Sequence, residues 1–276
     1  MLIRRLTTLE DCRKVAALER VVWGYSDPED IVPPTILIVS IKRGGILLGA
    51  FDSSEELKGF VFSMPGTKDG RLIQWSHMLG VAPEAREAGV GLRLKLAQRN
   101  EALGAGIDVV EWTFDPLQAL NAHLNFARLG VIAEEYEQNI YGDSSSPLHQ
   151  GTPTDRFVAE WRLTSPHVER RLVAQATSFL RDSAVMTAVL VNPSVETAGG
   201  LAPGPPVLDS PAERLLVEIP TGFTALLTRN PELALAWRTT TRTIFTTYFA
   251  RGYRVVDFFL SREAGRGQYF LAPRPK

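Results

Sequence analysis

The chain has 276 residues, enough for one large or two small domains, and no apolar run approaches the roughly 20 residues of a membrane-spanning helix. Its 30 basic and 31 acidic residues give a formal net charge of −1, so no whole-molecule field favours nucleic acid as a partner. The single cysteine, Cys12, excludes a disulfide within the chain, four unclustered histidines make a metal site unexpected, and a signal-peptide core is missing, so we expect a soluble, cytoplasmic protein without a metal.

The N-terminal part of the sequence predicts one strand, two helices and three further strands. Thr7 or Thr8 can cap the first helix, Gly24 can end it, and Pro33-Pro34 suits the first turn of the second. Acidic and serine residues at 52–56 separate two apolar runs as a hairpin turn does. The expected elements are strand Leu2–Leu6, helices Leu9–Trp23 and Pro34–Ile41, and strands Gly44–Phe51, Lys58–Met64 and Arg71–Val81.

The junction that follows Val81 is the most distinctive stretch of the sequence. A strand containing Gln74–Val81 runs into two closely spaced glycines, Gly89 and Gly91, and a helix follows over Leu92–Leu103. Glycine lets a backbone turn and approach a ligand, and the first N–H groups of a helix, with its dipole, favour a pyrophosphate. An ordinary glycine-containing turn is the alternative, because the order of the glycines fits neither a Walker loop nor a dinucleotide fingerprint.

A second strand–helix unit carries the second motif, Asn121 to Val131. Pro116 stops its strand, Gly130 closes its helix, and a stretch rich in serine, proline and glycine predicts a long loop. The expected elements are strand Ile107–Phe114, helix Leu117–Leu129, strand Val131–Tyr141, loop Gly142–Asp155 and strand Arg156–Leu163.

The first motif, Leu79-Gly80-Val81-Ala82-Pro83 with Arg86, Gly89 and Gly91, resembles the acyl-CoA loop of the GNAT N-acetyltransferase superfamily. The element order of residues 1–163 is also the GNAT order, and the second motif looks like that of a bacterial GNAT branch. The resemblance implies a GNAT acyl-CoA N-acyltransferase fold, an α/β (α+β) fold with a mixed central sheet. It implies acetyl-CoA or another acyl-CoA as co-substrate, held by loop amides at its pyrophosphate and by the preceding strand at its pantetheine arm. The implied contacts are Met78, Leu79, Gly80, Val81, Arg86, Glu87, Ala88, Gly89, Val90, Gly91 and Leu92, with Asn121 and Asn125 from the second motif.

One position departs from the family pattern. GNAT proteins often carry a tyrosine where this chain has Phe126, and that tyrosine commonly serves as general acid to the CoA thiolate. The general acid to the thiolate is therefore absent from this chain or is another residue. Tyr141 is the candidate acid, because a phenol at a strand end can donate a proton, and a structural tyrosine in the core or at its rim is the alternative.

Acyl transfer from a thioester to an amine requires that the ammonium lose its proton, that the carbonyl oxygen be stabilised, and that the thiolate leave. His77 lies one strand-length from the loop, and its ordinary pKa suits a general base, although a structural histidine is an equal alternative. Glu111 is the rival base, because a charged group inside an apolar strand is either paired or functional. Trp75, on the His77 face, and Arg156, which suits a carboxylate, are candidates for holding the acceptor. Pairing with Asp155 or Glu111 is the alternative for Arg156.

Residues 164–276 predict a C-terminal α/β domain. Phe126-Ala127-Arg128-Leu129-Gly130-Val131 is echoed by Phe249-Ala250-Arg251-Gly252-Tyr253-Arg254, and both end a helix with glycine and begin a strand. We interpret this domain as half a GNAT fold without a CoA loop, and chance similarity of two such junctions is the alternative. The expected elements are helix Ser165–Gln175, an irregular Pro/Gly-rich segment 192–211, strand Leu215–Ile219, helix Pro231–Arg251 with an apolar face at Leu233, Ala236, Trp237, Thr240, Ile244 and Phe245, and strands Tyr253–Leu260 and Gln268–Ala272.

The sequence therefore predicts an N-acyltransferase that moves an acetyl or related acyl group onto the primary amine of a small molecule, such as an amino acid. Because Cys12 lies far from the loop in sequence, direct attack in a ternary complex is expected rather than a covalent enzyme intermediate. A non-catalytic acyl-CoA-binding regulator and a protein N-acetyltransferase are the alternatives. The expected partners are the amine and, as one option, a second copy of the chain, without nucleic acid or membrane.

Overall fold

The computed structural model describes residues 1–142, 151–173 and 187–275. The described chain forms two compact units: unit 1 comprises Met1–Trp112 with Arg162–Thr164, and unit 2 comprises the remaining residues. The division falls inside strand β5 (Val109–Phe114), whereas the sequence suggested a boundary after Leu163. A GNAT domain over 1–163 followed by a domain over 164–276 stays a prediction about which segments fold on their own.

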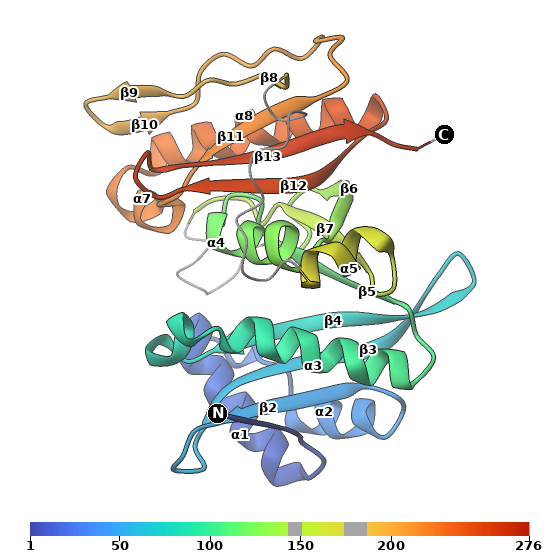
Figure 1. The fold of residues 1–276 in the computed structure, drawn as a ribbon. Helices are drawn as coiled ribbons and strands as arrows, with labels where there is room; N and C mark the ends of the chain where they lie inside the picture. Colours follow the sequence, from blue (N-terminus) through green and yellow to red (C-terminus); the bar gives the residue numbers. More distant parts are fainter. Residues whose placement is uncertain (143–150, 174–186, 276) are drawn as a thin grey trace. The chain divides into compact units, whose positions relative to one another are not determined.

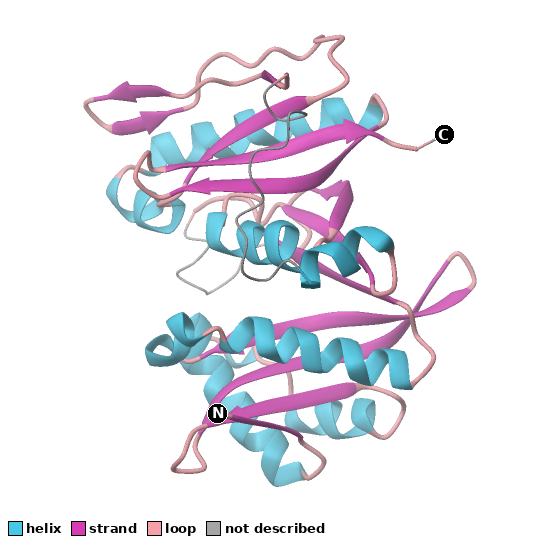
Figure 2. Cartoon of the chain, in the orientation of Figure 1, coloured by secondary structure: helices cyan, strands magenta, loops and turns pink. Residues whose placement is uncertain are grey.

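Unit 1 is a mixed sheet with α1 and α2 on one face and α3 on the other (Figures 1 and 2). Its strand order is β1-β2-β3-β4-β5, and every neighbouring pair is antiparallel except β4–β5. The elements are β1 Leu2–Arg5, α1 Leu9–Trp23, η1 Pro28–Asp30, α2 Pro34–Ile41, β2 Ile46–Phe51, β3 Leu57–Lys68, β4 Arg71–Val81, η2 Pro83–Ala88, α3 Val90–Gly104 and the start of β5. The predicted α/β class and element order are confirmed, while the short 3₁₀ helices η1 and η2 were not predicted.

The ends of α1 show how local sequence fixes this unit. The Thr8 hydroxyl accepts the N–H of Asp11, and the Asp11 carboxylate accepts the N–H of Thr8, which satisfies two N–H groups at the start of the helix. Gly24 ends the helix in the left-handed conformation, with φ 66°. The inner face of α1 then packs into a core whose buried members are Leu6, Cys12, Val15, Leu37, Leu47, Phe51, Phe60, Phe62 and Met78.

A buried carboxyl, that of Glu19, joins α1 to the segment before α2. The residue is 1% exposed, and its Oε1 accepts the N–H of Val32 at 3.1 Å. Within the described chain its Oε2 has no hydrogen-bond partner. Burial raises the pKa of Glu19 to about 7, against the opposing effect of the Val32 N–H, so the carboxyl is protonated in mildly acidic solution.

Unit 2 contains a sheet of order β7-β6-β12-β13-β11-β8, along which the long helix α8 packs (Figure 1). Its elements are the end of β5, α4 Ala119–Ala122 continuing as the π-helical η3 His123–Leu129, β6 Ile132–Glu137, β7 Arg156–Arg162, α5 Pro166–Val173, β8 Val189–Leu190, β9 Val195–Thr197, β10 Gly200–Ala202, β11 Leu215–Pro220, α7 Phe223–Arg229, α8 Pro231–Ala250, β12 Tyr253–Ser261 and β13 Arg266–Pro273. The last two residues of the helix expected over Ser165–Gln175 and most of the loop expected over Gly142–Asp155 lie outside the described residues.

Several expectations for unit 2 were wrong in detail. The strand expected over Val131–Tyr141 ends at Glu137, because Asn139 takes a left-handed φ of 48° and its side chain accepts the N–H of Thr154. Tyr141 therefore lies in a turn and not at a strand end. The segment 192–211 contains the antiparallel hairpin β9–β10, and helix α7 was not predicted.

The sheet of unit 2 contains an internal repeat. Gly130 and Gly252, with φ 72° and 84°, end the helical segments before β6 and β12, and each strand starts an antiparallel hairpin, β6–β7 or β12–β13. Ala133 and Val255 each stand three residues after their glycine, and they pair with each other where β6 meets β12. Both hairpins shift register directly after these positions. The two halves are thus related by an approximate twofold axis, and the similarity of the two helix–glycine–strand junctions is structural.

The aromatic core of unit 2 follows the same axis. The register pairs Tyr136 with Phe157 in one hairpin and Phe258 with Tyr269 in the other. The rings of Phe157 and Tyr269 lie 5.4 Å apart, so the two pairs meet in one cluster. Further rings complete it from β5 and the helices: Phe114, Phe126, Phe245 and Phe249. Residues on both sides of Leu163 therefore share a single core.

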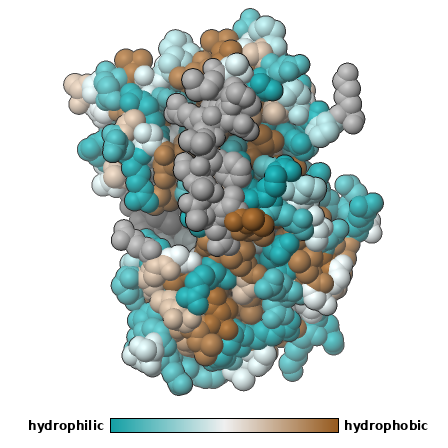
Figure 3. Space-filling view, in the orientation of Figure 1, coloured by the Kyte–Doolittle hydropathy of each residue, from teal (hydrophilic) through white to brown (hydrophobic). Residues whose placement is uncertain are grey.

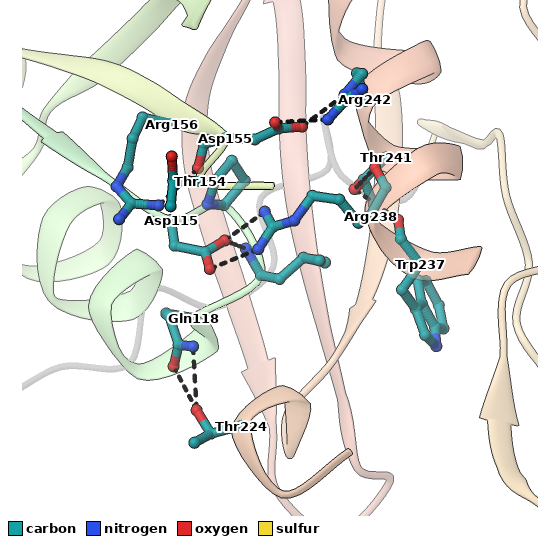
Figure 4. A network of polar contacts seen from close by, with 12 residues as sticks. Asp115, Gln118, Thr154, Asp155, Arg156, Thr224, Trp237, Arg238, Thr241 and Arg242 are labelled. Atoms are coloured by element: carbon teal, nitrogen blue, oxygen red, sulfur yellow. Dashed lines mark hydrogen bonds and ion pairs between the residues drawn. The ribbon is translucent and has the colours of Figure 1, made fainter. Parts of the chain in front are cut away.

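Two bidentate ion pairs hold α8 to this unit (Figure 4). Arg238 donates from both terminal nitrogens to Asp115, at 2.7 Å each, and the pair is buried, with side chains 1% and 4% exposed. One turn later Arg242 donates to both oxygens of Asp155, at 2.7 Å each, and Tyr136 donates its hydroxyl to the same carboxylate. Burial alone would raise the pKa of Asp115, but the arginines lower it below its usual value.

These pairs change the buried face of α8 from the one expected. The face consists of Ala234, Trp237, Arg238, Thr241, Ile244, Phe245, Tyr248 and Phe249. Ala236, expected inside, is exposed, because the helix is rotated so that Arg238 points into the core. The spacing of apolar residues in the sequence cannot show that an arginine is buried on the same face of the helix.

Some large apolar side chains remain at the surface. Ile36 and Val39 of α2 are 53% and 60% exposed, and Leu72 of β4 is 54% exposed. On the face drawn in Figure 3, hydrophobic residues are mixed with hydrophilic ones in both units. Scattered exposed apolar residues are normal in folded proteins, so the homodimer stays a prediction.

Replacing Arg238 with methionine should destabilise the protein by about 3–5 kcal/mol, because the Asp115 carboxylate stays buried without its arginine. Urea unfolding followed by circular dichroism measures the loss. The control is Arg13→Met, whose pair with Glu10 is exposed on both sides and should contribute less than about 1 kcal/mol. Equal stability of the two variants would contradict this role for the buried pair.

Glu19→Gln should remove a pH dependence of stability. The folded protein holds the Glu19 proton up to about pH 7, whereas the unfolded chain loses it near the ordinary 4.5, so stability falls as the pH rises through this window. The glutamine keeps the acceptor for Val32 and carries no charge. At pH 8 the variant should exceed the parent by on the order of 1–3 kcal/mol, and at pH 4 the two should be equal. Urea unfolding across this pH range gives the curves, and parallel curves would contradict the assignment.

Candidate functional site

Helix α3 begins with an open N-terminus. Gly89 is its N-cap residue, in the left-handed conformation with φ 68°, and none of the described side chains caps the helix. The first turn contains no acidic residue, and the first N–H bonded back into the helix is that of Arg93, to the Gly89 carbonyl at 3.1 Å. The N–H groups of Val90, Gly91 and Leu92 therefore lie at the positive end of the helix dipole. This end is suited to an anion such as a pyrophosphate.

The 3₁₀ helix η2 brings the chain from β4 to this N-terminus, and its last residues are Arg86, Glu87 and Ala88. The Arg86 guanidinium donates to the carbonyls of Val81 and Val22 at 3.3 and 3.4 Å, and the residue is exposed. These hydrogen bonds are long. The arginine thus lies at the surface beside the junction.

The pairing of β4 with β5 ends before β4 reaches the junction. The ladder between these parallel strands consists of Gln74 with Val110 and Trp75 with Glu111, and in the described chain it stops there. The other edge of β4 stays paired with β3 as far as Val81. The β5-side edge of Met78–Val81 can therefore pair with an extended ligand. We refer to this divergence of the two strands as the fork.

A bulge marks the start of the fork. Phe62 pairs with Met78 and Met64 pairs with Trp75, so a single β3 residue faces both Ser76 and His77. Such an extra residue redirects the side chains of the strand. The directions of the Ser76 and His77 side chains therefore cannot be predicted from the simple alternation of a regular strand.

His77 is exposed to solvent, and its ring meets the Phe62 ring edge-on, with centroids 6.4 Å apart. The protein around it lowers the pKa of His77 by desolvation. The imidazole is therefore neutral near pH 7 and able to accept a proton. Position and protonation state both suit the predicted general base.

Glu111, the rival base, is buried and 4% exposed. Its Oε1 forms an ion pair with Lys68 at the end of β3. This pair connects β3 to β5. Trp75, the predicted acceptor contact, is half-buried and pairs with Glu111 across the ladder.

Unit 2 brings together two other predicted residues, Tyr141 and Arg156. The Tyr141 hydroxyl is 2.6 Å from the Thr113 hydroxyl, and the Arg156 guanidinium lies 5.3 Å from the centre of the Tyr141 ring. Tyr141 is 46% exposed, whereas Arg156 is buried and donates to the Asp155 carbonyl at 3.0 Å. The turn of Tyr141 is held by its N–H, which donates to the Thr154 hydroxyl.

The second motif divides between surface and core. Asn121 is exposed on α4, whereas Asn125 is buried in the π-helical segment. Phe126 is 0% exposed, and its ring packs edge-on against Tyr269 at 5.7 Å. The Tyr269 hydroxyl is no substitute acid, because it donates to the Pro116 carbonyl and burial raises its pKa well above 10.

Sequence reasoning missed the polar residues beneath the fork and at the end of β5. Lys95 stands between two leucines of α3, and this interruption of an apolar pattern was the available signal. Thr113 and Asp115 precede and follow the last residue of β5, where only the stop at Pro116 was used. Among the described residues, no helix is long and apolar enough to cross a membrane, and no three His, Cys, Asp or Glu side chains are arranged as metal ligands.

Comparisons with known proteins give matches among solved structures alone: no protein-family model and no curated protein matches the sequence. An acetyltransferase of the GNAT family from Streptococcus pneumoniae is 17% identical with a TM-score of 0.46, over 58% of this chain and 97% of that chain. An aminoglycoside 6'-acetyltransferase type Ii is 18% identical with a TM-score of 0.46, over 60% and 99%. Naa20 of Chaetomium thermophilum, in complex with a bisubstrate analogue, is 16% identical with a TM-score of 0.47, over 64% and 90%. The fold of the chain is similar to those of these GNAT acetyltransferases.

Proposed function

We propose that the protein is an acyl-CoA-dependent N-acyltransferase. The observation that carries the proposal is the open N-terminus of α3 next to the unpaired edge of β4. The N–H groups of Val90, Gly91 and Leu92 would bind the pyrophosphate, with Arg86 beside it, and the edge of Met78–Val81 would pair with the amides of the pantetheine arm. A ligand that joins a pyrophosphate to an arm with amide groups would use both features.

Acyl-CoA supplies an activated thioester, and this chain's residues handle the proton of the amine. His77, neutral and at the bulge, is the proposed general base that removes a proton from the acceptor ammonium, so that the amine can attack the carbonyl carbon. Tyr141 is the proposed acid for the departing thiolate, and Asn121 and Asn125 are proposed cofactor contacts. Trp75 and Arg156 are proposed to hold the acceptor, a small primary amine such as an amino acid.

A second candidate function is favoured by one observation. Phe126, at the position where the family commonly has its acid, is fully buried in the aromatic core and cannot donate a proton. A protein that binds acyl-CoA without turnover would need no acid. Incubation with acetyl-CoA and a panel of amines, with free thiol as readout, separates the two functions, because a regulator would bind and release no thiol. Peptide acceptors in the same panel test for a protein N-acetyltransferase.

Gly89→Asp should weaken CoA binding, because it places a carboxylate next to the pyrophosphate site at the α3 N-terminus. The control is Gly70→Asp: Gly70 also has a positive φ, 74° against 68°, and a Cβ at either glycine meets nothing within 4 Å, so backbone strain is matched. Calorimetric titration with CoA should show a loss of about 10-fold or more for Gly89→Asp alone, or at least 1.4 kcal/mol. Equal affinity of the two variants would remove the proposed site.

His77→Gln should lower turnover about 10²–10⁴-fold while CoA affinity is kept, if His77 is the general base. Because desolvation lowers the pKa of His77, activity of the parent should fall on the acid side only below the ordinary value near 6.5. The variant should lose this acid limb. Glu111→Gln serves as comparison and should keep it. If Glu111→Gln lost the acid limb and His77→Gln kept it, the general base would be Glu111 and not His77.

A further inference from the structure

Lys95 of α3 is buried at the start of the fork. Its side chain is fully enclosed, and the residue is 1% exposed. Its Nζ donates to the Ser76 hydroxyl at 2.9 Å and to Gln98 Oε1 at 3.1 Å, and it lies 3.6 Å from the centre of the Trp112 ring. Desolvation lowers the pKa of Lys95 well below 10.5.

The contacts of Lys95 fall on the first residues beyond the ladder. The last pair of β4 and β5 is Trp75 with Glu111, so Ser76 and Trp112 are the next residue on each strand. Lys95 Nζ contacts both of them. Ser76 is also a residue of the β4 bulge and precedes His77. One amine therefore connects the two strands at the point where they diverge.

Gln98, one turn further along α3, completes the cluster. It is 0% exposed, and its Nε2 lies 3.0 Å from the same Ser76 hydroxyl. Burying an amine is costly unless hydrogen bonds compensate, and an apolar residue would fill the same space without that cost. What Lys95 and Gln98 add over an apolar pair is a fixed position of Ser76, and thereby of the bulge.

We propose that Lys95 is a positioning residue that fixes the separation of β4 and β5 at the start of the fork and holds the bulge residues Ser76 and His77 in place. The proposal rests on the proposed function in its final step, the placement of His77 for acyl transfer. A misplacement of catalytic groups by about 1 Å costs up to about 10²-fold in rate. Lys95 thus acts through Ser76 and does not touch the reacting atoms.

The test compares Lys95→Met, which keeps the length of the side chain and removes its donors, with the parent and with Lys14→Met, an exposed lysine of α1. Amide hydrogen exchange of residues 76–81 reports the fork, and it requires no activity. In Lys95→Met these amides should exchange about 10-fold or more faster, while those of β2 keep their protection. Lys14→Met should match the parent.

The kinetic readout separates positioning from stability. Lys95→Met should lower kcat by about 10–10²-fold with CoA affinity within about 3-fold of the parent. Ser76→Ala added to Lys95→Met should cost little more, because the two residues act as one unit. Lys95→Gln, which keeps a donor, should lie between Lys95→Met and the parent, and it replaces Lys95→Met if that variant fails to fold.

The outcomes distinguish the two proposals. Altered exchange at residues 76–81 in a protein without acyl-CoA turnover supports the role of Lys95 at the fork and removes the proposed function. Parent-like exchange and kcat in folded Lys95→Met overturn the inference. Parallel losses of kcat, CoA affinity and protection across the whole of unit 1 also overturn it, because they indicate a role in stability alone.

Discussion

The carboxylate of Asp115 is the constraint on which unit 2 depends. A charge removed from water this completely needs an opposite charge in contact, and Arg238 supplies it from a position 123 residues later in the sequence. The bidentate geometry allows one rotation of α8, and that rotation brings Arg242 to Asp155. Both pairs couple the first half of the repeat to the second, so the end of β5, the start of β7 and the last helix are fixed together.

The aromatic residues that pack around these pairs explain why a phenylalanine fits at position 126. Phe126 is 0% exposed, and its ring packs against Phe114 of β5 and Tyr269 of β13, so a tyrosine there would place a hydroxyl among aromatic rings. Position 126 is therefore a packing position in this chain. Tyr141, by contrast, is exposed, and its hydroxyl is hydrogen-bonded to that of Thr113.

The sequence predicted most elements because their signals are local. Thr8, Gly24, Pro34 and Gly130 mark helix ends by backbone chemistry that needs no distant partner. The features that could not be predicted depend on contacts between residues far apart in the sequence. The rotation of α8 depends on Asp115, and the early end of β6 depends on the Thr154 N–H, which the Asn139 side chain accepts. The burial of Lys95 depends on Ser76 and Trp112. The glycine junction after Val81 was predicted because its signal is also local. The bulge that orients His77 was not, because it depends on the register between two strands.

The pairing of Ala133 with Val255 has a consequence for association. In half of the repeat alone, β6 would be an edge strand with unpaired N–H and C=O groups, ready to pair with another chain. Here β12 of the same chain occupies that edge. The second half thus takes the place that a second subunit would take. Because its contact with β6 is intramolecular, this contact does not depend on the concentration of the protein. Dilution cannot separate the halves as it separates subunits, and the paired edge of β6 is not available to a neighbouring chain.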